Sequence, residues 1–496
     1  MRSLVIAPVV LLLAACTLTP DYERPVLDVP QQYRQPAADG GSIANLDWWE
    51  LFRDAQLKHL IEIALEENKD LGVALQRIYE ARSRLTFTRA DQFPFLDVFG
   101  SASRSDSSDV LVPGSSAGNH YTLAADLTFE VDLWGRLRRA TEAARADLLA
   151  TDAAYRNVTI SLVANVAGTY FLLRDLDKRL AISEYTVQGR RDSLDIIQAR
   201  FDKGTVPELD VNQAQIELAI AEAAVASFRR QIVQAENALR ILLGLNPGPV
   251  PRGLALEQQE LPEILPPGLP AELLQRRPDL VAAEEQLRAE TARIGVAEAL
   301  RYPSINLFAG LGLESDDASD FTSSDAKTWS IGANLFAPIF NSGKLKAQAE
   351  GQRARTEQAM LNYEATLQTA LREVEDALVA IQSYREEHAA RTRQAVAARN
   401  AARLSRARYD GGVVDYLEVL DSERSLFSAE LEQSVTLRQY LNAILELYKA
   451  LGGGWSAAGS PPQTAGATVL HPEGRAGYDG IARIPGNNYL QETANE

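Results

Sequence analysis

Two acidic side chains near the C-terminus have the spacing of a charged site. Glu418 and Asp421 are three residues apart, so on a helix both carboxylates lie on one face. Carboxylates grouped in this way attract cations, repel anions and favour some proton uptake through mutual repulsion. The same spacing also occurs on ordinary solvated helix faces, so the pair alone does not identify a site.

The chain lacks the residue patterns of common catalytic and metal sites. It contains no Ser/His/Asp order, phosphate loop or zinc signature, and its single cysteine excludes an intramolecular disulfide. A net charge of -17 leaves no general basic surface for nucleic acid. We therefore expect no enzyme, no catalytic residues, no metal and no nucleic-acid partner. The four histidines are scattered: His59, His120, His388 and His471.

The single cysteine, Cys16, ends an apolar segment that runs from Leu4 to Ala15. Twelve residues span only ~18 Å as a helix against a hydrocarbon core of ~30 Å, so residues 1–15 are predicted to be a secretory signal. The Leu-Ala-Ala-Cys box resembles a bacterial lipoprotein signal, which implies a covalent lipid on Cys16 and, with Thr17 following, delivery to the outer membrane. The alternative is an ordinary signal peptide that ends in a chance cysteine.

The body of the chain is two copies of one plan. Leu133-Trp-Gly-Arg-Leu-Arg-Arg139 aligns with Asn341-Ser-Gly-Lys-Leu-Lys-Ala347 at an offset of about 208 residues, and Phe201–Val206 aligns with Tyr409–Val414 at the same offset. Repetition at a fixed offset over this distance predicts an internal duplication. Each copy is expected to run as helix, strand, strand, long helix, tip and helix.

Strict alternation predicts the strands. From residue 121 to 133 the odd positions are apolar and most even positions are polar or acidic, and residues 328–335 repeat the pattern. Strands of ~9 to 11 residues with one apolar and one polar face fit a transmembrane barrel with a wet interior. A soluble sandwich with one buried face fits the periodicity equally well. Polar loops between paired strands favour the barrel, because they place all helical material on one side of a membrane.

The strand count bears on the oligomeric state. Four strands cannot close a barrel, and lipid does not tolerate an open sheet edge. Two chains would give eight strands and a filled interior, whereas three would give twelve strands and room for a lumen. A membrane-spanning sheet therefore requires several chains.

The predicted helices are unusually long. Residues 136–202 and 344–408 contain no proline, so each could form one helix of ~100 Å. In the second, apolar residues step by four and three, as in a coiled coil: Leu367, Leu371, Val374, Leu378 and Ile381. The helices of residues 54–90 and 206–243 are about half as long, so two stacked end to end would match one long helix. A solid bundle or spacer rod is the alternative interpretation.

Together the lipobox, Trp48-Trp49, Arg277-Pro-Asp-Leu280 and the two Gly-containing tips resemble the outer-membrane factor family. These are the TolC- and OprM-like channel tunnels of tripartite efflux pumps, and the chain is similar to the lipoprotein branch called NodT. The resemblance implies a mixed α and β homotrimer, with a twelve-stranded β-barrel in the outer membrane above a periplasmic tunnel of twelve helices. It also implies a periplasmic adaptor and an inner-membrane pump of the RND type as partners.

The expected domain boundaries follow the duplication. They are 1–15 for the signal, 16–53 for an N-terminal segment of the equatorial belt, 54–245 for repeat 1, 246–270 for a belt linker, 271–452 for repeat 2, and 453–496 for a C-terminal belt or flexible tail. The strands are expected at about 95–105, 121–133, 304–313 and 328–340, and the helices beside the two tips at about 136–202, 206–243, 344–408 and 414–451.

The resemblance places function at the tips. It implies adaptor docking at the residues of the two tips, which are Gly204, Thr205, Val206, Gly412, Val413 and Val414. It matches Glu418 and Asp421 with paired aspartates at the tunnel constriction, although the first is Glu here. It matches Asp210 and Tyr409 with residues whose hydrogen bonds hold the tips shut. The family arginine of this latch is replaced by Val414, which puts a salt-bridged latch in doubt.

Three functions remain open on the sequence. The first is a passive outer-membrane efflux duct, the second an exit duct of a type I protein secretion system on the same fold, and the third a non-conducting, lipid-anchored coiled coil. The lipobox favours small-molecule efflux over polypeptide secretion. No nucleotide site or membrane proton relay is recognisable, so the energy and the choice of substrate are expected to come from the pump.

Overall fold

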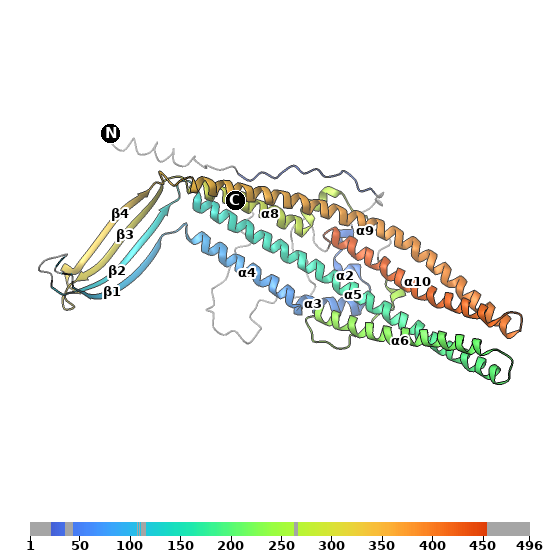
Figure 1. The fold of residues 1–496 in the computed structure, drawn as a ribbon. Coiled ribbons are helices and arrows are strands. Elements are labelled where there is room, and N and C mark those ends of the chain that lie inside the picture. Colours follow the sequence, from blue (N-terminus) through green and yellow to red (C-terminus); the bar gives the residue numbers. More distant parts are fainter. Residues whose placement is uncertain are drawn as a thin grey trace.

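The computed structural model describes residues 21–34, 43–106, 108, 110, 116–261 and 266–453. Within these ranges a four-stranded sheet forms one end of an elongated molecule and two helical hairpin tips form the other (Figure 1). None of the helices in these ranges is both long enough and apolar enough to cross a membrane. Cys16, the predicted lipidation site, lies outside the described residues. The same holds for almost all of region 453–496, the predicted C-terminal belt or flexible tail.

α2 (Trp48–Leu51) precedes the first repeat. The first repeat contains α3 (Ala55–Glu67), α4 (Lys69–Ala90), β1 (Phe95–Ser105), β2 (Gly118–Val131), α5 (Arg136–Asp202) and α6 (Glu208–Leu242). The second contains α7 (Leu273–Arg276), α8 (Pro278–Ala299), β3 (Ser304–Ser315), β4 (Lys327–Phe336), α9 (Lys344–Asp410) and α10 (Tyr416–Ala450). Short 3-10 turns occur at Ile43–Asn45, Leu256–Gln258, Pro270–Glu272 and Ser324–Ala326. The predicted fold class is confirmed in its helices, strands and duplication.

The sheet is antiparallel throughout, in the order β1-β2-β3-β4. Asp97 pairs with Asp126 and Asp126 pairs with Gly310, so one face of the sheet carries the polar side chains. The other face is apolar and exposed in the single chain, with Trp329 and Ile331 about three-quarters exposed. The outer edges of β1 and β4 have no partner strand among the described residues.

Two strands, β2 and β4, end earlier than expected, and the structure shows the reason in each case. The strand expected at 121–133 ends at Val131, because the Asp132 carboxylate accepts hydrogen bonds from the backbone N–H groups of Leu137 and Arg138 and so caps α5. The strand expected at 328–340 ends at Phe336, two residues before Pro338, which has no N–H to donate to a ladder.

The helix expected at 54–90 is divided at Asn68. The Asn68 side chain caps α4 by accepting from the Leu71 N–H, and its amide donates to the Leu242 carbonyl at the end of α6. In the second repeat Arg277 donates in the same way to the Ala450 carbonyl at the end of α10. The short helices therefore meet end to end, as expected, and each junction is joined by one polar side chain.

The backbone repeats as well as the sequence. Positive φ angles occur at Gly135 and Gly343, at Gly204 and Gly412, and at Gly244 and Gly452, three pairs each separated by 208 residues. Glycine adopts this conformation without the steric cost that a Cβ imposes. The same turns therefore occur at the same places in both copies.

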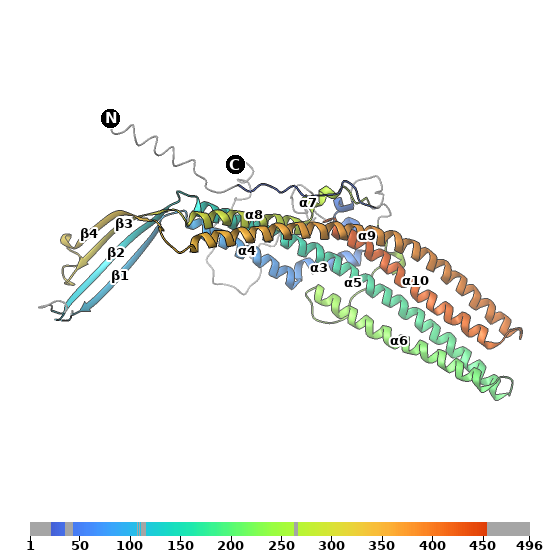
Figure 2. The same ribbon diagram turned by 45° about the horizontal axis from the view of Figure 1, so that its top comes forward.

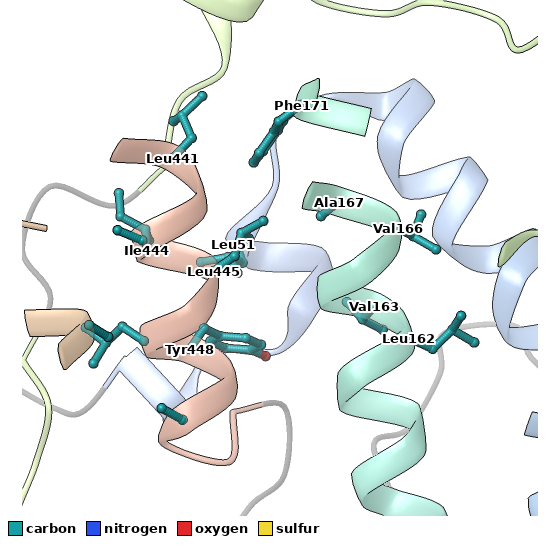
Figure 3. Close-up of a cluster of buried hydrophobic side chains, with 14 of the residues drawn as sticks. Leu51, Leu162, Val163, Val166, Ala167, Phe171, Leu441, Ile444, Leu445 and Tyr448 are labelled. Atoms are coloured by element: carbon teal, nitrogen blue, oxygen red, sulfur yellow. The ribbon is translucent and has the colours of Figure 1, made fainter. Parts of the chain in front are cut away.

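The main apolar core lies midway along the helices. It joins α2 and α3 to α5, α9 and α10 through fully buried side chains such as Leu51, Val166, Phe171 and Leu445 (Figure 3). The predicted seam of α9 contributes to it: Leu367, Val374 and Ile381 are buried, and Leu371 and Leu378 are partly buried against them. Beyond this core the hairpins α5/α6 and α9/α10 extend together to the tips (Figure 2).

Candidate functional site

Each hairpin tip is a tight turn built around a glycine. After α5, the N–H of Gly204 donates to the Phe201 carbonyl and that of Thr205 donates to the Arg200 carbonyl. After α9, the N–H groups of Gly412 and Val413 make the equivalent bonds to Tyr409 and Arg408. These bonds satisfy the last carbonyls of both long helices. The tips are thus well defined turns that project from the rest of the chain.

The predicted docking residues form the exposed end of the molecule. Gly204, Thr205, Gly412 and Val413 are exposed, whereas Val206 and Val414 are partly buried against the apolar residues behind them. Two further residues, Leu209 and Leu417, are 62% and 58% exposed, and they occupy equivalent positions in the two repeats. Sequence reasoning missed both leucines, although a leucine repeated at the duplication offset outside the core pattern could have revealed them.

The acidic pair lies on α10 immediately after the second tip. Glu418 and Asp421 are both exposed, one turn apart on the same helix. The Glu418 carboxylate accepts from the guanidinium of Arg408 at 2.8 Å, an ion pair across the hairpin turn. No ion pair of Asp421 occurs within the described part of the chain. Arg408, which the sequence did not single out, therefore offsets one of the two charges.

The predicted latch residues occupy different environments. Tyr409 is buried in a small apolar group, here called the distal cluster, and within the described ranges its hydroxyl has no hydrogen-bond partner. The guanidinium of Arg200 lies 4.7 Å from the Tyr409 ring centre, and the Tyr416 ring lies 5.4 Å from it. The distal cluster consists of Ile197, Val211, Ala214, Tyr409, Tyr416, Val419 and Leu420.

Asp210 is partly buried at the start of α6. Burial raises the pKa of its carboxyl, and the negative charge of Asp415 adds to the shift. No hydrogen bond joins Asp210 to Tyr409 in this conformation of the described residues. The latch therefore remains a prediction, and the contact observed at Tyr409 is the Arg200 guanidinium.

The described N-terminal segment, residues 21–34, lies along the helices. The Asp21 carboxylate accepts from Arg139 at 2.7 Å, just inside the start of α5, and the Tyr22 hydroxyl donates to Glu284 on α8. Arg139 belongs to the first turn of α5, and α5 begins next to the sheet (Figure 1), so this ion pair holds Asp21 at that end of the helix. Among the described residues, no group of three or more His, Cys, Asp or Glu side chains is arranged to hold a metal ion.

Comparisons with known proteins cover most of the chain and agree with one another. The family model described as "Outer membrane efflux protein" matches residues 60–245 and 269–453, which are the two repeats. The chain is 37% identical over 458 residues to the toluene efflux pump outer membrane protein TtgI of Pseudomonas putida, covering 90% of this chain and 97% of that protein. It is 35% identical over 455 residues to the cation efflux system protein CusC of Escherichia coli, covering 90% and 98%.

A solved structure gives the same result. The open state of the MtrE outer membrane channel of Neisseria gonorrhoeae superimposes with a TM-score of 0.81 at 31% identity, covering 88% of this chain and 98% of that one. The family model and the relatives cover far more than half of this chain. With its two repeats, open four-stranded sheet and paired helical hairpins, the chain belongs to the outer membrane efflux protein family.

Proposed function

We propose that three copies of this chain form the outer-membrane channel of a tripartite efflux system, which conducts substrates passively and is gated at the helical tips. The observation that carries the proposal is the open four-stranded sheet with an exposed apolar face at one end of two long helical hairpins. A member of this family is an outer-membrane efflux protein and not an enzyme.

A trimer would pair the two open edges of the sheet with strands from neighbouring copies. In a membrane the unpaired backbone groups of β1 and β4 have no water to bond, so each edge requires a strand from another copy. Twelve strands leave room for a lumen, and three pairs of hairpins would continue that lumen as a tunnel. The polar sheet face would then line the barrel, and residues 16–53 and 246–270 would form a belt around the helices.

The anchor is proposed to be a covalent lipid on Cys16. Only four residues separate Cys16 from Asp21, which is paired with Arg139 near the sheet end of the molecule. An acyl chain on Cys16 would therefore reach the membrane beside the barrel of the same trimer. Two or three chains give stable anchoring, since each buried CH₂ contributes ~0.8 kcal/mol.

The partners are proposed to be a periplasmic adaptor at the tips and an inner-membrane pump of the RND type. The exposed apolar side chains around the tips, Leu209, Val413 and Leu417, are suited to packing against an adaptor. The named relatives serve toluene and cation efflux, which is consistent with a duct that leaves substrate choice to the pump.

The gate is proposed to lie at Glu418 and Asp421. In a trimer each residue becomes a ring of three carboxylates, and such rings favour cations. Single-channel conductance of the purified protein in a planar bilayer tests both the pore and the gate. Wild type should show a small, cation-selective conductance, and Glu418→Ala with Asp421→Ala should raise the conductance and reduce the selectivity.

A matched control is available on α5. Asp192 and Asp195 are also three residues apart, exposed and near the tips, but they belong to the other hairpin. Asp192→Ala with Asp195→Ala should leave conductance and selectivity unchanged. Equal effects of the two double variants would move the constriction away from α10, and the absence of any conductance after insertion as an oligomer would refute the channel.

A further inference from the structure

The apolar packing between the two hairpins is interrupted. The buried members of the main core end at Leu176 on α5, Phe228 on α6 and Leu441 on α10, and those of the distal cluster begin at Ile197, Ala214 and Leu420 on the same helices. Close-packed apolar cores deform poorly, whereas ion pairs can exchange partners and take up water. The interval between the two cores is thus a place where one part of the hairpins could move relative to the other.

Three charged side chains, one on each of α5, α6 and α10, meet within this interval. Arg190 on α5 and Glu217 on α6 are both buried, and their Nη2 and Oε2 atoms are 3.0 Å apart. Arg424 on α10 donates from Nε to Oε1 of Glu217 at 2.5 Å. We call Arg190, Glu217 and Arg424 the ionic clamp.

The ionic clamp is not fully satisfied. Within the described residues, the buried Nε of Arg190 has no hydrogen-bond partner, and Oε2 of Glu217 contacts Arg190 without hydrogen-bond geometry. Unsatisfied buried polar atoms cost free energy in the conformation that buries them. The observed arrangement is therefore less favourable at this level than in a well-packed core.

The two ends of the clamp respond differently to separation of the hairpins. Glu217 and Arg190 belong to the same hairpin, so Glu217 would keep a positive partner if α10 moved away. The Arg424 side chain is already 48% exposed and would pass into water at little cost. The cross-hairpin contact can therefore break without leaving a buried charge uncompensated.

Nearer the main core, the contacts between the hairpins have the opposite property, because a buried charge in one hairpin has its hydrogen-bond partners in the other. Asp175 on α5 is fully buried and accepts from Ser434 at 2.5 Å and from Arg438 at 3.2 Å, both on α10. The nearest cation in its own hairpin, Arg179, is 3.8 Å away and makes no hydrogen bond to it. Separation at this level would break both of these hydrogen bonds and leave Asp175 with only the 3.8 Å contact to Arg179, which is costly.

We propose that the Arg424–Glu217 contact is a releasable clamp that holds the gate shut, and that hairpin separation during opening stops between Glu217 and Asp175. This inference rests on the proposed channel and adds Arg424 to it as a positioning residue. The two levels are ten residues apart on α10, or ~15 Å along the helix. The distal cluster and the tips would thus move away from the other hairpin while the main core keeps its packing.

Thiol labelling tests the clamp without relying on conduction. A cysteine at Ala214, buried in the distal cluster, reports separation below the clamp, and one at Ala370, buried in the main core, reports separation above it. Each rate is measured against the parent that carries Cys16 alone. Arg424→Gln should speed labelling at position 214 about tenfold, as expected for the loss of one charged hydrogen bond, and leave position 370 unchanged.

The matched control is Arg399→Gln. Arg399 pairs with Glu430 at 2.6 Å, also an arginine–glutamate pair, but both residues belong to the α9/α10 hairpin. This variant should leave labelling unchanged, and Arg424→Lys, which keeps the charge, should restore part of the slow rate. Unchanged labelling at position 214 in Arg424→Gln, or equal acceleration at positions 214 and 370, would overturn the proposal.

Conductance separates this inference from the proposed function. Arg424→Gln should raise the mean conductance of the channel, whereas Arg399→Gln should not. A conducting wild type whose conductance does not change in Arg424→Gln overturns the clamp and leaves the channel intact. A wild type that inserts as an oligomer without conducting overturns the channel, and the labelling rates then decide the clamp on their own.

Discussion

Asp54 is the residue on which the contacts between the first repeat and the linker converge. Its carboxylate is buried, caps α3 through the N–H groups of Gln56 and Leu57, and accepts from the Tyr170 hydroxyl at 3.0 Å and the Leu254 N–H at 2.9 Å. Burial raises the pKa of Asp54, but hydrogen bonds from Gln259, Tyr170 and the backbone outweigh burial, and the net pKa lies below its usual value. The charged form is therefore the one that stabilises the fold.

This arrangement predicts a stability that depends on pH. Because the folded-state pKa lies below that of the unfolded chain, the contribution of Asp54 is complete above about pH 4 and is lost as the pH falls through the folded-state pKa. Asp54→Asn should lower the free energy of unfolding by about 2 kcal/mol at pH 7. The difference in stability between this variant and wild type should become smaller at low pH. Thermal unfolding followed by circular dichroism at pH 7 and at low pH measures both effects.

Asp47 provides the control for Asp54. It also precedes a helix, α2, but its side chain makes no capping hydrogen bond. Asp47→Asn should therefore change the unfolding temperature little. If the two variants were equally stable at pH 7, the hydrogen bonds around Asp54 would not carry the stability assigned to them.

At the scale of elements, the helix junctions explain why two half-length helices can replace a long one. Gly244, with φ +70°, follows α6, and a Cβ at this position would lie 2.1 Å from the Glu67 carbonyl oxygen at the end of α3. Gly452 occupies the equivalent position after α10, where a Cβ would lie 2.9 Å from the Arg276 carbonyl oxygen. The two chain segments approach so closely only because glycine has no side chain.

A pair of glycine variants separates this close approach from the backbone angle. Gly204 at the tip has almost the same φ, +73°, but no atom lies within 4 Å of its would-be Cβ. Gly204→Ala should cost about 1 kcal/mol from backbone strain alone. Gly244→Ala should cost about 3 kcal/mol, because the clash with the Glu67 carbonyl adds to that strain. Denaturant unfolding measures the loss of stability in each variant. Equal losses would contradict the close contact inferred at the junction.

At the scale of the whole molecule, the two faces of the sheet require different surroundings, one apolar and one aqueous. Ile331 lies on the apolar face and is 76% exposed, and its neighbour Ser330 lies on the polar face opposite Gly310. In an assembled barrel the first face would contact lipid and the second would line the lumen. Both conditions belong to the assembly proposed above, because the four described strands of one chain leave two unpaired edges.

Lysine substitutions at these adjacent positions test the assignment of the faces. Ile331→Lys should reduce the amount of protein integrated in outer-membrane fractions, since a lipid-facing lysine costs ~2–4 kcal/mol near the bilayer midplane. Ser330→Lys should integrate normally, because its side chain would face water. Equal integration of both variants, or loss only of Ser330→Lys, would reverse the faces or exclude the barrel.

Periodic features were predictable from the sequence alone. The long helix expected at 136–202 is α5, and that expected at 344–408 differs from α9 by two residues. No proline interrupts either helix, and glycines with positive φ precede each start and follow each end. The strands follow from alternation, and the duplication follows from a constant offset that the positive φ angles repeat. Such signals are local and recur along the chain, so one sequence is enough to recognise them.

The side-chain pairings near the hairpin tips were decided only by the tertiary structure. The pairing of Glu418 with Arg408, the burial of Tyr409 beneath Arg200, and the contact of Arg424 with a glutamate 207 residues away have no periodic signature. The first depends on the turn that joins α9 to α10, and the other two depend on the register in which helices from the two repeats pack against one another. That register is set by the close packing of the main core and the distal cluster, a property of surfaces that meet only after the chain has folded.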